Sequence, residues 1–190
     1  RQIVSRGVPA DKVYTVTNGI DEEVFVPKSR NTELRRQYGW GDKLIAMYIG
    51  THGLSQGLST LLDAARLLQH REDIHFVFAG TGAEREMLIE QAQDMQLRNV
   101  TFLPMQAKAD MPDFYASADI CLVPLKKRDV FRYNIPSKMF EIMACARPIL
   151  LGVEGQAKEL LEEAQAGEAV EPENATAFAQ AIVRLGSNPE

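Results

Sequence analysis

The sequence has few of the residues that mark secreted, membrane-spanning or metal-binding proteins. It contains only two cysteines in 190 residues, which give no disulfide framework and suit a reducing, cytosolic compartment. No stretch approaches the roughly 18 apolar residues of a membrane span, and the first ten residues carry no signal peptide. Its three histidines are scattered, without metal-ligand spacing. We therefore expect a cytoplasmic protein with no metal site and no cofactor.

The chain also lacks an excess of basic residues. It carries 26 acidic and 21 basic side chains, for a net charge of −5, and this balance argues against a nucleic-acid surface. Its length suits one α/β domain with a proper core, whereas two independent domains would be cramped. The chain starts at Arg1 rather than at Met, so we expect a segment of a longer protein.

Short apolar runs without alternation, each followed by a helical pattern, predict a parallel sheet covered on both faces. Right-handed crossovers then give an α/β domain with a doubly wound, Rossmann-like parallel sheet. The expected strands are 44–49, 74–79, 100–103, 120–123, 149–151 and 169–170, and the expected helices are 31–38, 57–69, 84–95, 110–117, 137–145, 156–164 and 174–185.

The opening of the chain differs from this pattern. Residues 13–21 predict a strand that runs into an Asn-Gly turn at Asn18 and Gly19. We divide the chain into residues 1–27, an interdomain joint with the first strand, and residues 28–190, the Rossmann-like domain. The alternative is that 13–21 is simply the first strand and turn of that domain.

The most informative stretch is 135–144, a loop that leads into a short helix. Pro136 suits the first helical position, and Ser137 and Lys138 occupy the first turn, where unpaired N–H groups attract anions. Glu141 lies one turn further on the same face. A cation for phosphate with a carboxylate behind it for a ribose diol is the layout of a nucleotide-sugar site. The alternative is a Lys–Glu surface pair on an ordinary amphipathic helix.

Four loops that follow predicted strands have unusual composition, and ligands of open parallel sheets bind beyond such strand ends. Residues 50–57 hold three glycines, and 80–82 read Gly-Thr-Gly without the third glycine of a dinucleotide fingerprint. Residues 103–106 could form a wall for a flat base. Residues 124–136 are basic and could supply charge for a diphosphate or remain solvated. A second basic run, 28–36, is expected to be a solvated helix face.

Taken in order, these pieces resemble the C-terminal, donor-binding domain of a retaining glycosyltransferase with the GT-B fold, in the glycosyl transferases group 1 family. The matching stretches are Asn18-Gly19-Ile20-Asp21 with Phe25 and Pro27, then 48–57, 78–82, 100–103, 111–119 and 136–148. The resemblance implies that an N-terminal acceptor domain, absent from this chain, binds the acceptor and makes any membrane contact, at the inner face of the plasma membrane.

The resemblance further implies that the chain binds a nucleoside diphosphate sugar, in bacterial surface polysaccharide or glycolipid synthesis, and that alone it is inactive. Lys138 would be catalytic, stabilising the departing diphosphate, and Glu141 would hold the ribose hydroxyls. The full donor-binding set is Gly50, Thr51, His52, Gly53, Gln56, Gly80, Gly82, Met105, Gln106, Arg132, Tyr133, Ile135, Pro136, Ser137 and Glu141.

Two departures from the family pattern affect the expected chemistry. Many members have a glutamate where this chain has Tyr133, so the donor sugar is the least determined part. Many also have Arg and Lys in the first glycine loop, where this chain has Thr51 and Gln56. Phosphate charge would then rest on Lys138, Arg132, His52 and backbone amides.

Three other readings stay open on sequence alone. A sugar-nucleotide epimerase of the same architecture would need acid and base side chains in the cleft between its lobes. A nicotinamide oxidoreductase is disfavoured, because 80–82 open no Gly-x-Gly-x-x-Gly motif. A non-catalytic binding module would use residues 126–138 as a partner surface.

Overall fold

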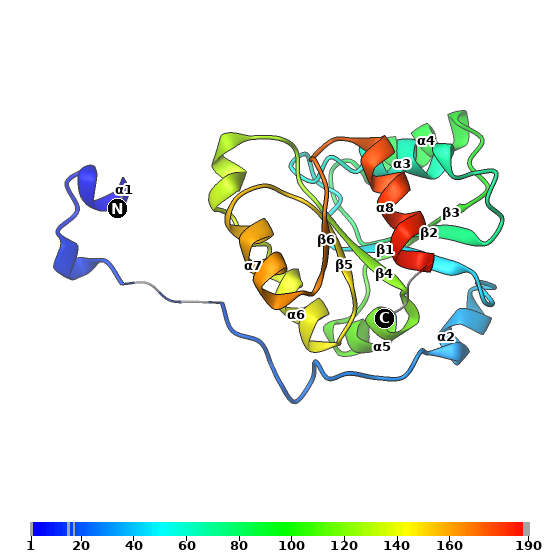
Figure 1. Ribbon diagram of the computed structural model, residues 1–190, viewed down its shortest axis with the longest axis horizontal. Helices are drawn as coiled ribbons and strands as arrows, with labels where there is room; N and C mark the ends of the chain where they lie inside the picture. The colour runs from blue at the N-terminus through cyan, green and yellow to red at the C-terminus, as the bar shows by residue number, and fades with distance from the viewer. Residues whose placement is uncertain (1, 15, 17, 188–190) are drawn as a thin grey trace.

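The computed structural model describes residues 2–14, 16 and 18–187, and these form a doubly wound α/β domain with a preceding arm (Figure 1). Its six-stranded sheet is parallel throughout, in the order β3-β2-β1-β4-β5-β6. The strands are β1 (Leu44–Ile49), β2 (Ile74–Ala79), β3 (Val100–Leu103), β4 (Ile120–Pro124), β5 (Ile149–Gly152) and β6 (Gly167–Ala169). The predicted fold class is confirmed.

The central strands form because nearly every one of their side chains is apolar and buried, as two covered faces require. The bounds of β1, β2 and β3 match the prediction, and β4 and β5 are each one residue longer. The predicted position of β6, 169–170, is wrong by two residues at its start. This edge strand begins at Gly167 and Glu168, which are not apolar. Because the prediction followed the apolar residues, and glycine has low strand propensity, it placed the start of the strand at residue 169.

The helices are α1 (Gln2–Ser5), α2 (Thr32–Gln37), α3 (Ser59–Leu67), α4 (Arg85–Asp94), α5 (Met111–Ser117), α6 (Lys138–Ala144), α7 (Gln156–Ala164) and α8 (Ala175–Ser187), with 3-10 turns η1 (Ala10–Lys12), η2 (Lys108–Asp110) and η3 (Asp129–Tyr133). The predicted helices from α2 to α8 are confirmed to within two residues at each end.

Helices cover both faces of the sheet (Figure 1). On one face, α3, α4 and α8 pack over a core that includes Phe76, Phe78 and Phe178. On the other face, α5, α6 and α7 enclose a core that includes Trp40 and Met139.

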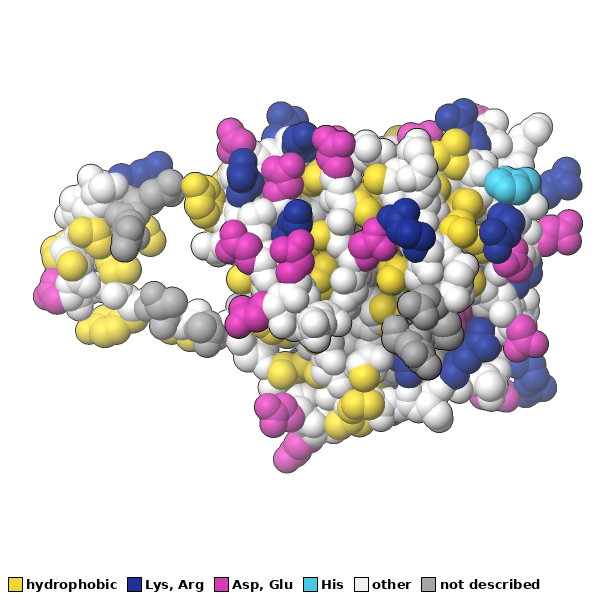
Figure 2. Space-filling view, in the orientation of Figure 1, with side chains coloured by type: hydrophobic (Ala, Val, Ile, Leu, Met, Phe, Trp, Pro, Cys, Tyr) yellow, Lys and Arg dark blue, Asp and Glu magenta, His cyan; other side chains and the backbone are white. Residues whose placement is uncertain are grey.

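The strand predicted at the opening of the chain is wrong for the residues that the structure describes. Val13, Tyr14 and Val16 lie outside any strand, and residues 15 and 17 lie outside the described residues. This arm stands away from the folded domain (Figures 1 and 2). Tyr14 and Val16 are 83% and 89% exposed. Their β propensity alone does not form a strand here, because no neighbouring strand among the described residues pairs with them.

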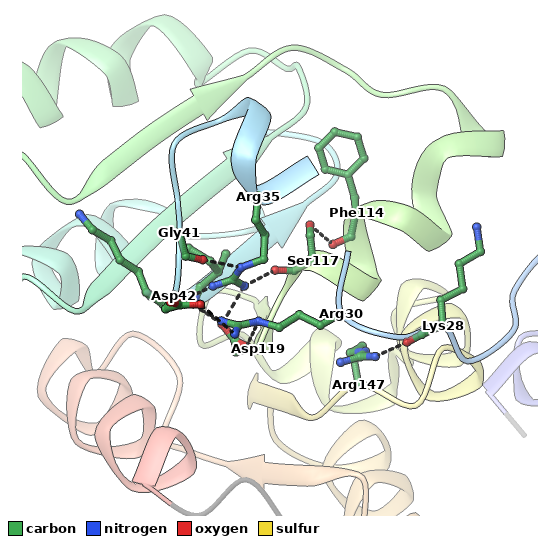
Figure 3. A network of polar contacts seen from close by, with 11 residues as sticks. Lys28, Arg30, Arg35, Gly41, Asp42, Phe114, Ser117, Asp119 and Arg147 are labelled. Carbon is green, nitrogen blue, oxygen red and sulfur yellow. Dashed lines mark hydrogen bonds and ion pairs between the residues drawn. The ribbon is translucent and has the colours of Figure 1, made fainter. Parts of the chain in front are cut away.

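A buried arginine ties α2 to the amino ends of β1 and β4 (Figure 3). Arg35 is only 2% exposed and donates to the carbonyls of Gly41 (2.9 Å), Ser117 (2.7 Å) and Lys43. It also donates to Asp119 Oδ2 at 3.1 Å, and the same oxygen accepts from the amide of Ile45 at 2.7 Å.

The expectation of a solvated basic face over 28–36 is therefore wrong for Arg35. Five donors in a planar fork let this residue satisfy several buried carbonyls at once, which composition alone does not reveal. No helix within the described ranges is long and apolar enough to cross a lipid bilayer.

Candidate functional site

The strand order reverses direction between β1 and β4, and the candidate site lies beyond the carboxyl ends of these two strands. The loops that follow them meet there, since the amide of Lys126 donates to the carbonyl of Ser55 at 2.8 Å. A cavity of about 420 Å³ opens between the loops. Its lining residues are Asn18, Gln56, Val123, Pro124, Leu125, Asn134, Ile135, Pro136, Ser137 and Lys138.

Lys138 is the charged group of this cavity. It is the first residue of α6, and its Nζ donates to the carbonyl of Ile49 at 2.7 Å and lies 4.1 Å from the ring centre of Tyr48. Burial lowers the pKa of Lys138 to about 8, while the nearby Glu141 carboxylate acts in the opposite direction. The side chain is therefore still mostly cationic at pH 7. An ammonium has three N–H donors, so donors remain for a ligand.

Glu141 lies one helical turn beyond Lys138 and is half-buried. Its Oε2 accepts a hydrogen bond from the hydroxyl of Tyr115 at 2.9 Å. Burial, together with the Glu141 carboxylate, raises the pKa of Tyr115, so this hydroxyl stays protonated and donates. Among the described residues Oε1 of Glu141 has no hydrogen-bond partner. Glu141 is not one of the described residues that line the cavity, so its contact with a ribose diol remains a prediction.

Tyr115 is a contributor that the sequence analysis missed. It lies in α5, which was predicted as an amphipathic helix without a role in the site. The available sign was a tyrosine on the buried face of a helix, because a buried phenol needs a hydrogen-bond partner. Asn18 was assigned only to the interdomain joint, yet it lines the cavity.

Three of the predicted glycines owe their identity to close packing between loops. Gly50 has φ +143°, and a Cβ there would lie 2.5 Å from Lys138 Nζ. A Cβ on Gly80 would overlap the carbonyl of Gly50, and one on Gly82 would overlap the backbone of His52. Gly80 and Gly82 therefore press the loop after β2 against the loop after β1. These two glycines therefore stabilise the loop after β1 by packing against its backbone. A direct contact between them and a donor remains a prediction.

His52 is fully buried between the rings of Tyr48 and Phe102, at centroid distances of 5.8 and 6.3 Å. Burial, and then the charges of Arg85 and Lys138, lower the pKa of His52 to about 4. The imidazole is neutral at pH 7, and neither ring nitrogen has a hydrogen-bond partner in the part of the chain that the structure describes. The cationic role expected for His52 is wrong, because the ring points into the protein instead of toward an anion.

The other predicted residues divide between the cavity and its surroundings. Gln56, Ile135, Pro136 and Ser137 line the same cavity as Lys138, and their contact with a donor stays a prediction. Thr51 and Gly53 belong to the loop after β1, and the exposed Met105 follows β3 with Gln106, whose Nε2 donates to the carbonyl of Pro104 at 2.6 Å.

Arg132 and Tyr133 are not brought into the Lys138 cavity. They line a separate pocket with Gly155 and Gln156, and Arg132 Nη1 lies 4.0 Å from a carboxylate oxygen of Glu154. The cation surplus expected from 124–136 is also reduced by acids. Lys127 Nζ pairs with Glu171 at 2.9 Å, and Lys126 Nζ lies 4.0 Å from Glu84. Among the described residues that line the cavity, Lys138 is left as the one basic side chain.

The site thus offers two kinds of ligand contact, one to an anion and one to hydroxyl groups. Within the cavity lining, the Lys138 ammonium, the Gln56 amide and the Ser137 hydroxyl can bind a phosphate anion. The Glu141 carboxylate, which Tyr115 holds one helical turn beyond that lining, can bind vicinal hydroxyls of a ligand that extends past the cavity. Within residues 2–14, 16 and 18–187, no group of three or more His, Cys, Asp or Glu side chains has metal-binding geometry.

Known proteins resemble this chain in sequence and in fold. It is 27% identical over 187 residues to the alpha-D-kanosaminyltransferase of Streptomyces kanamyceticus, which covers 96% of this chain and 47% of that protein. It is 31% identical over 144 residues to the putative colanic acid biosynthesis glycosyl transferase WcaI of Escherichia coli K12, with 74% and 35% coverage. The chain therefore spans about half or less of the length of these relatives.

Among solved structures, Anabaena Alr3699/HepE in complex with UDP and glucose superposes with a TM-score of 0.80 at 21% identity. The match covers 97% of this chain and 50% of that chain. The family model described as glycosyl transferases group 1 matches residues 43–188, which include every strand of the sheet. The chain belongs to the glycosyl transferases group 1 family.

Proposed function

We propose that the chain is the C-terminal, donor-binding lobe of a retaining glycosyltransferase. The observation that carries this proposal is the placement of Lys138 at the point where the sheet reverses direction, with Glu141 one turn behind it. A nucleoside diphosphate sugar would lie with its diphosphate on the ammonium and its ribose on the carboxylate. The complex of Anabaena Alr3699/HepE with UDP and glucose supports this ligand class.

In the proposed reaction Lys138 stabilises the leaving group. The bond between the anomeric carbon and the diphosphate oxygen breaks, and its electron pair stays on that oxygen. The ammonium and its partly buried setting stabilise the developing charge. An acceptor hydroxyl then bonds to the anomeric carbon from the same face, and its proton passes to the departing diphosphate oxygen, so that the configuration is retained.

The acceptor would be bound by a further lobe. The chain covers 47% of the kanosaminyltransferase and 35% of WcaI, which leaves room in such proteins for a second lobe. We propose that the full protein acts in the cytoplasm in surface polysaccharide or glycolipid synthesis, as the name of WcaI suggests for that relative, and that any membrane contact is made by the other lobe.

Binding of UDP and GDP to the chain, measured by calorimetry at pH 7, tests the proposal. Lys138→Met keeps much of the side-chain volume and removes the charge. It should weaken binding by about 10-fold or more, because a hydrogen bond to a charged group contributes roughly 1.5–3 kcal/mol. Glu141→Gln should weaken binding to a similar extent.

The matched control is Lys127→Met, which removes an equivalent charge whose ammonium already pairs with Glu171 outside the cavity. This variant should bind as the wild type does. Wild-type affinity in Lys138→Met, or failure of both nucleotides to bind at millimolar concentration, would refute the proposed function.

A further inference from the structure

We propose that Tyr48 is a positioning residue that joins the two halves of the donor site. Its ring face holds the Lys138 ammonium, and its hydroxyl fixes the backbone of the loop after β1. This inference rests on the proposed function, since it concerns how the donor-binding ammonium is held.

The hydroxyl contact fixes the loop where it leaves the sheet. Tyr48 is the next-to-last residue of β1 and is 1% exposed, and its Oη donates to the carbonyl of Thr51 at 2.7 Å. Burial raises the pKa of Tyr48, so the hydroxyl remains a donor at any physiological pH. The bond spans three residues and closes a turn around Gly50. The ring and the loop therefore keep one relative position.

The ring contact holds the cation. Lys138 Nζ lies 4.1 Å from the ring centre and donates a hydrogen bond to the carbonyl of Ile49 at 2.7 Å. An aromatic face attracts a cation through its quadrupole and partly replaces lost water. The ring thus supports the charged form of a side chain whose pKa burial lowers to about 8.

Gly50 completes the arrangement by leaving space. A Cβ at this position would lie 2.5 Å from Lys138 Nζ and 3.5 Å from Tyr48 Oη. The ammonium, the phenol and the bare backbone thus meet at one point. A tyrosine with only a packing role would not need its hydroxyl on the loop or its face under the ammonium.

The pH dependence of nucleotide binding separates positioning from packing. The titratable groups facing the ammonium are Glu141 on its own helix, Cys121 on β4 and His52 in the loop after β1. Burial raises the pKa of Cys121 to about 12 and lowers that of His52 to about 4. A break in log Kd near pH 8 that Lys138→Met removes therefore reports Lys138, and affinity falls as pH rises through it. Ionisation of the uracil ring of UDP at higher pH is common to all variants and is subtracted by the comparison.

The experiment compares Tyr48→Phe with Tyr48→Met by UDP titration from pH 7 to 10, alongside urea unfolding. Tyr48→Phe keeps the ring and should leave the break in place while weakening affinity by about five-fold, the size of one lost neutral hydrogen bond. Tyr48→Met loses the ring and should also move the break down by about half a pH unit or more.

The control is Phe78→Met, which removes another buried aromatic ring of the same core, stacked on Phe102 at 5.2 Å. It should lower stability without moving the break. If Tyr48→Met behaves like this control, the ring half of the proposal is wrong. Tyr48→Phe differs from the wild type by one oxygen atom, so unchanged affinity in this variant overturns the hydroxyl half even if Tyr48→Met does not fold.

Lys138→Met distinguishes the two levels of the proposal. If Lys138→Met weakens binding and abolishes the break but the Tyr48 variants change neither, the proposed function stands and the role of Tyr48 fails. If Lys138→Met leaves both affinity and break unchanged, the proposed function itself fails.

Discussion

Mild acid should destabilise this domain through two buried imidazoles. His52 is fully buried and His75 is 8% exposed, and burial lowers the pKa of each to about 4 from an ordinary value of 6.5. Between these pH values the unfolded chain binds protons that the folded chain rejects. The free energy of unfolding therefore rises with pH across this window. The contribution of the two neutral, buried histidines to stability is fully present above about pH 6.5 and is lost as pH falls toward 4.

The size of the effect follows from the two pKa values. At pH 5 an unfolded histidine is almost fully protonated, while the buried ring stays largely neutral. Each residue then costs about 2 kcal/mol of stability relative to neutral pH. Both together cost about 4 kcal/mol, a large share of the roughly 5–15 kcal/mol of an ordinary domain.

Urea unfolding of the chain at pH 7.5 and at pH 5.0 measures this loss. His52→Leu should shrink the difference between the two pH values by about 2 kcal/mol. At pH 7.5 it should be neutral or stabilising, because it removes two ring nitrogens that have no partner. His70→Leu, at an exposed histidine, is the matched control and should leave the difference unchanged. An undiminished difference in His52→Leu would show that the buried ring does not set the acid sensitivity.

Three further substitutions test the packing described above. Arg35→Met should cost about 3–5 kcal/mol in urea unfolding, since it leaves buried partners unpaired. Arg36→Met, at an exposed ion pair with i,i+3 spacing, should change stability very little, because water screens exposed pairs; equal losses would contradict the network. Gly80→Ala should lower both stability and UDP affinity, because its Cβ would overlap the loop after β1. Tyr115→Phe should weaken UDP binding by about five-fold by releasing the Glu141 carboxylate; unchanged calorimetric affinity would remove Tyr115 from the site.

The sheet could be predicted because its information is local. The runs that became β1, β2 and β4 are apolar almost throughout, and each is followed by a helical pattern, so both the strands and the crossovers were visible in the sequence. The helix that carries Lys138 could also be predicted locally, although its predicted first residue was wrong. Pro136 was expected at the first helical position, whereas α6 begins at Lys138 after Ser137 as its N-cap.

The contacts that could not be predicted join residues far apart in the chain. Glu141 meets Tyr115 across 26 positions, and Arg35 meets Asp119 across 84. The burial of His52 depends on loops after two different strands that pack together through Gly80 and Gly82. Composition described each of these residues as polar and left open whether it faced water, ligand or core.

The Arg35 network and the Lys138 cavity lie at opposite ends of the same two strands. A strand of six residues rises roughly 3.3 Å per residue, so about 17 Å separates the anchored end from the ligand end. The Arg35 network at the amino ends of the strands can therefore be strengthened or weakened while the cavity at their carboxyl ends keeps its geometry. Ligand preference can then be re-engineered in the loops after β1 and β4 without changing the Arg35 network that anchors these strands.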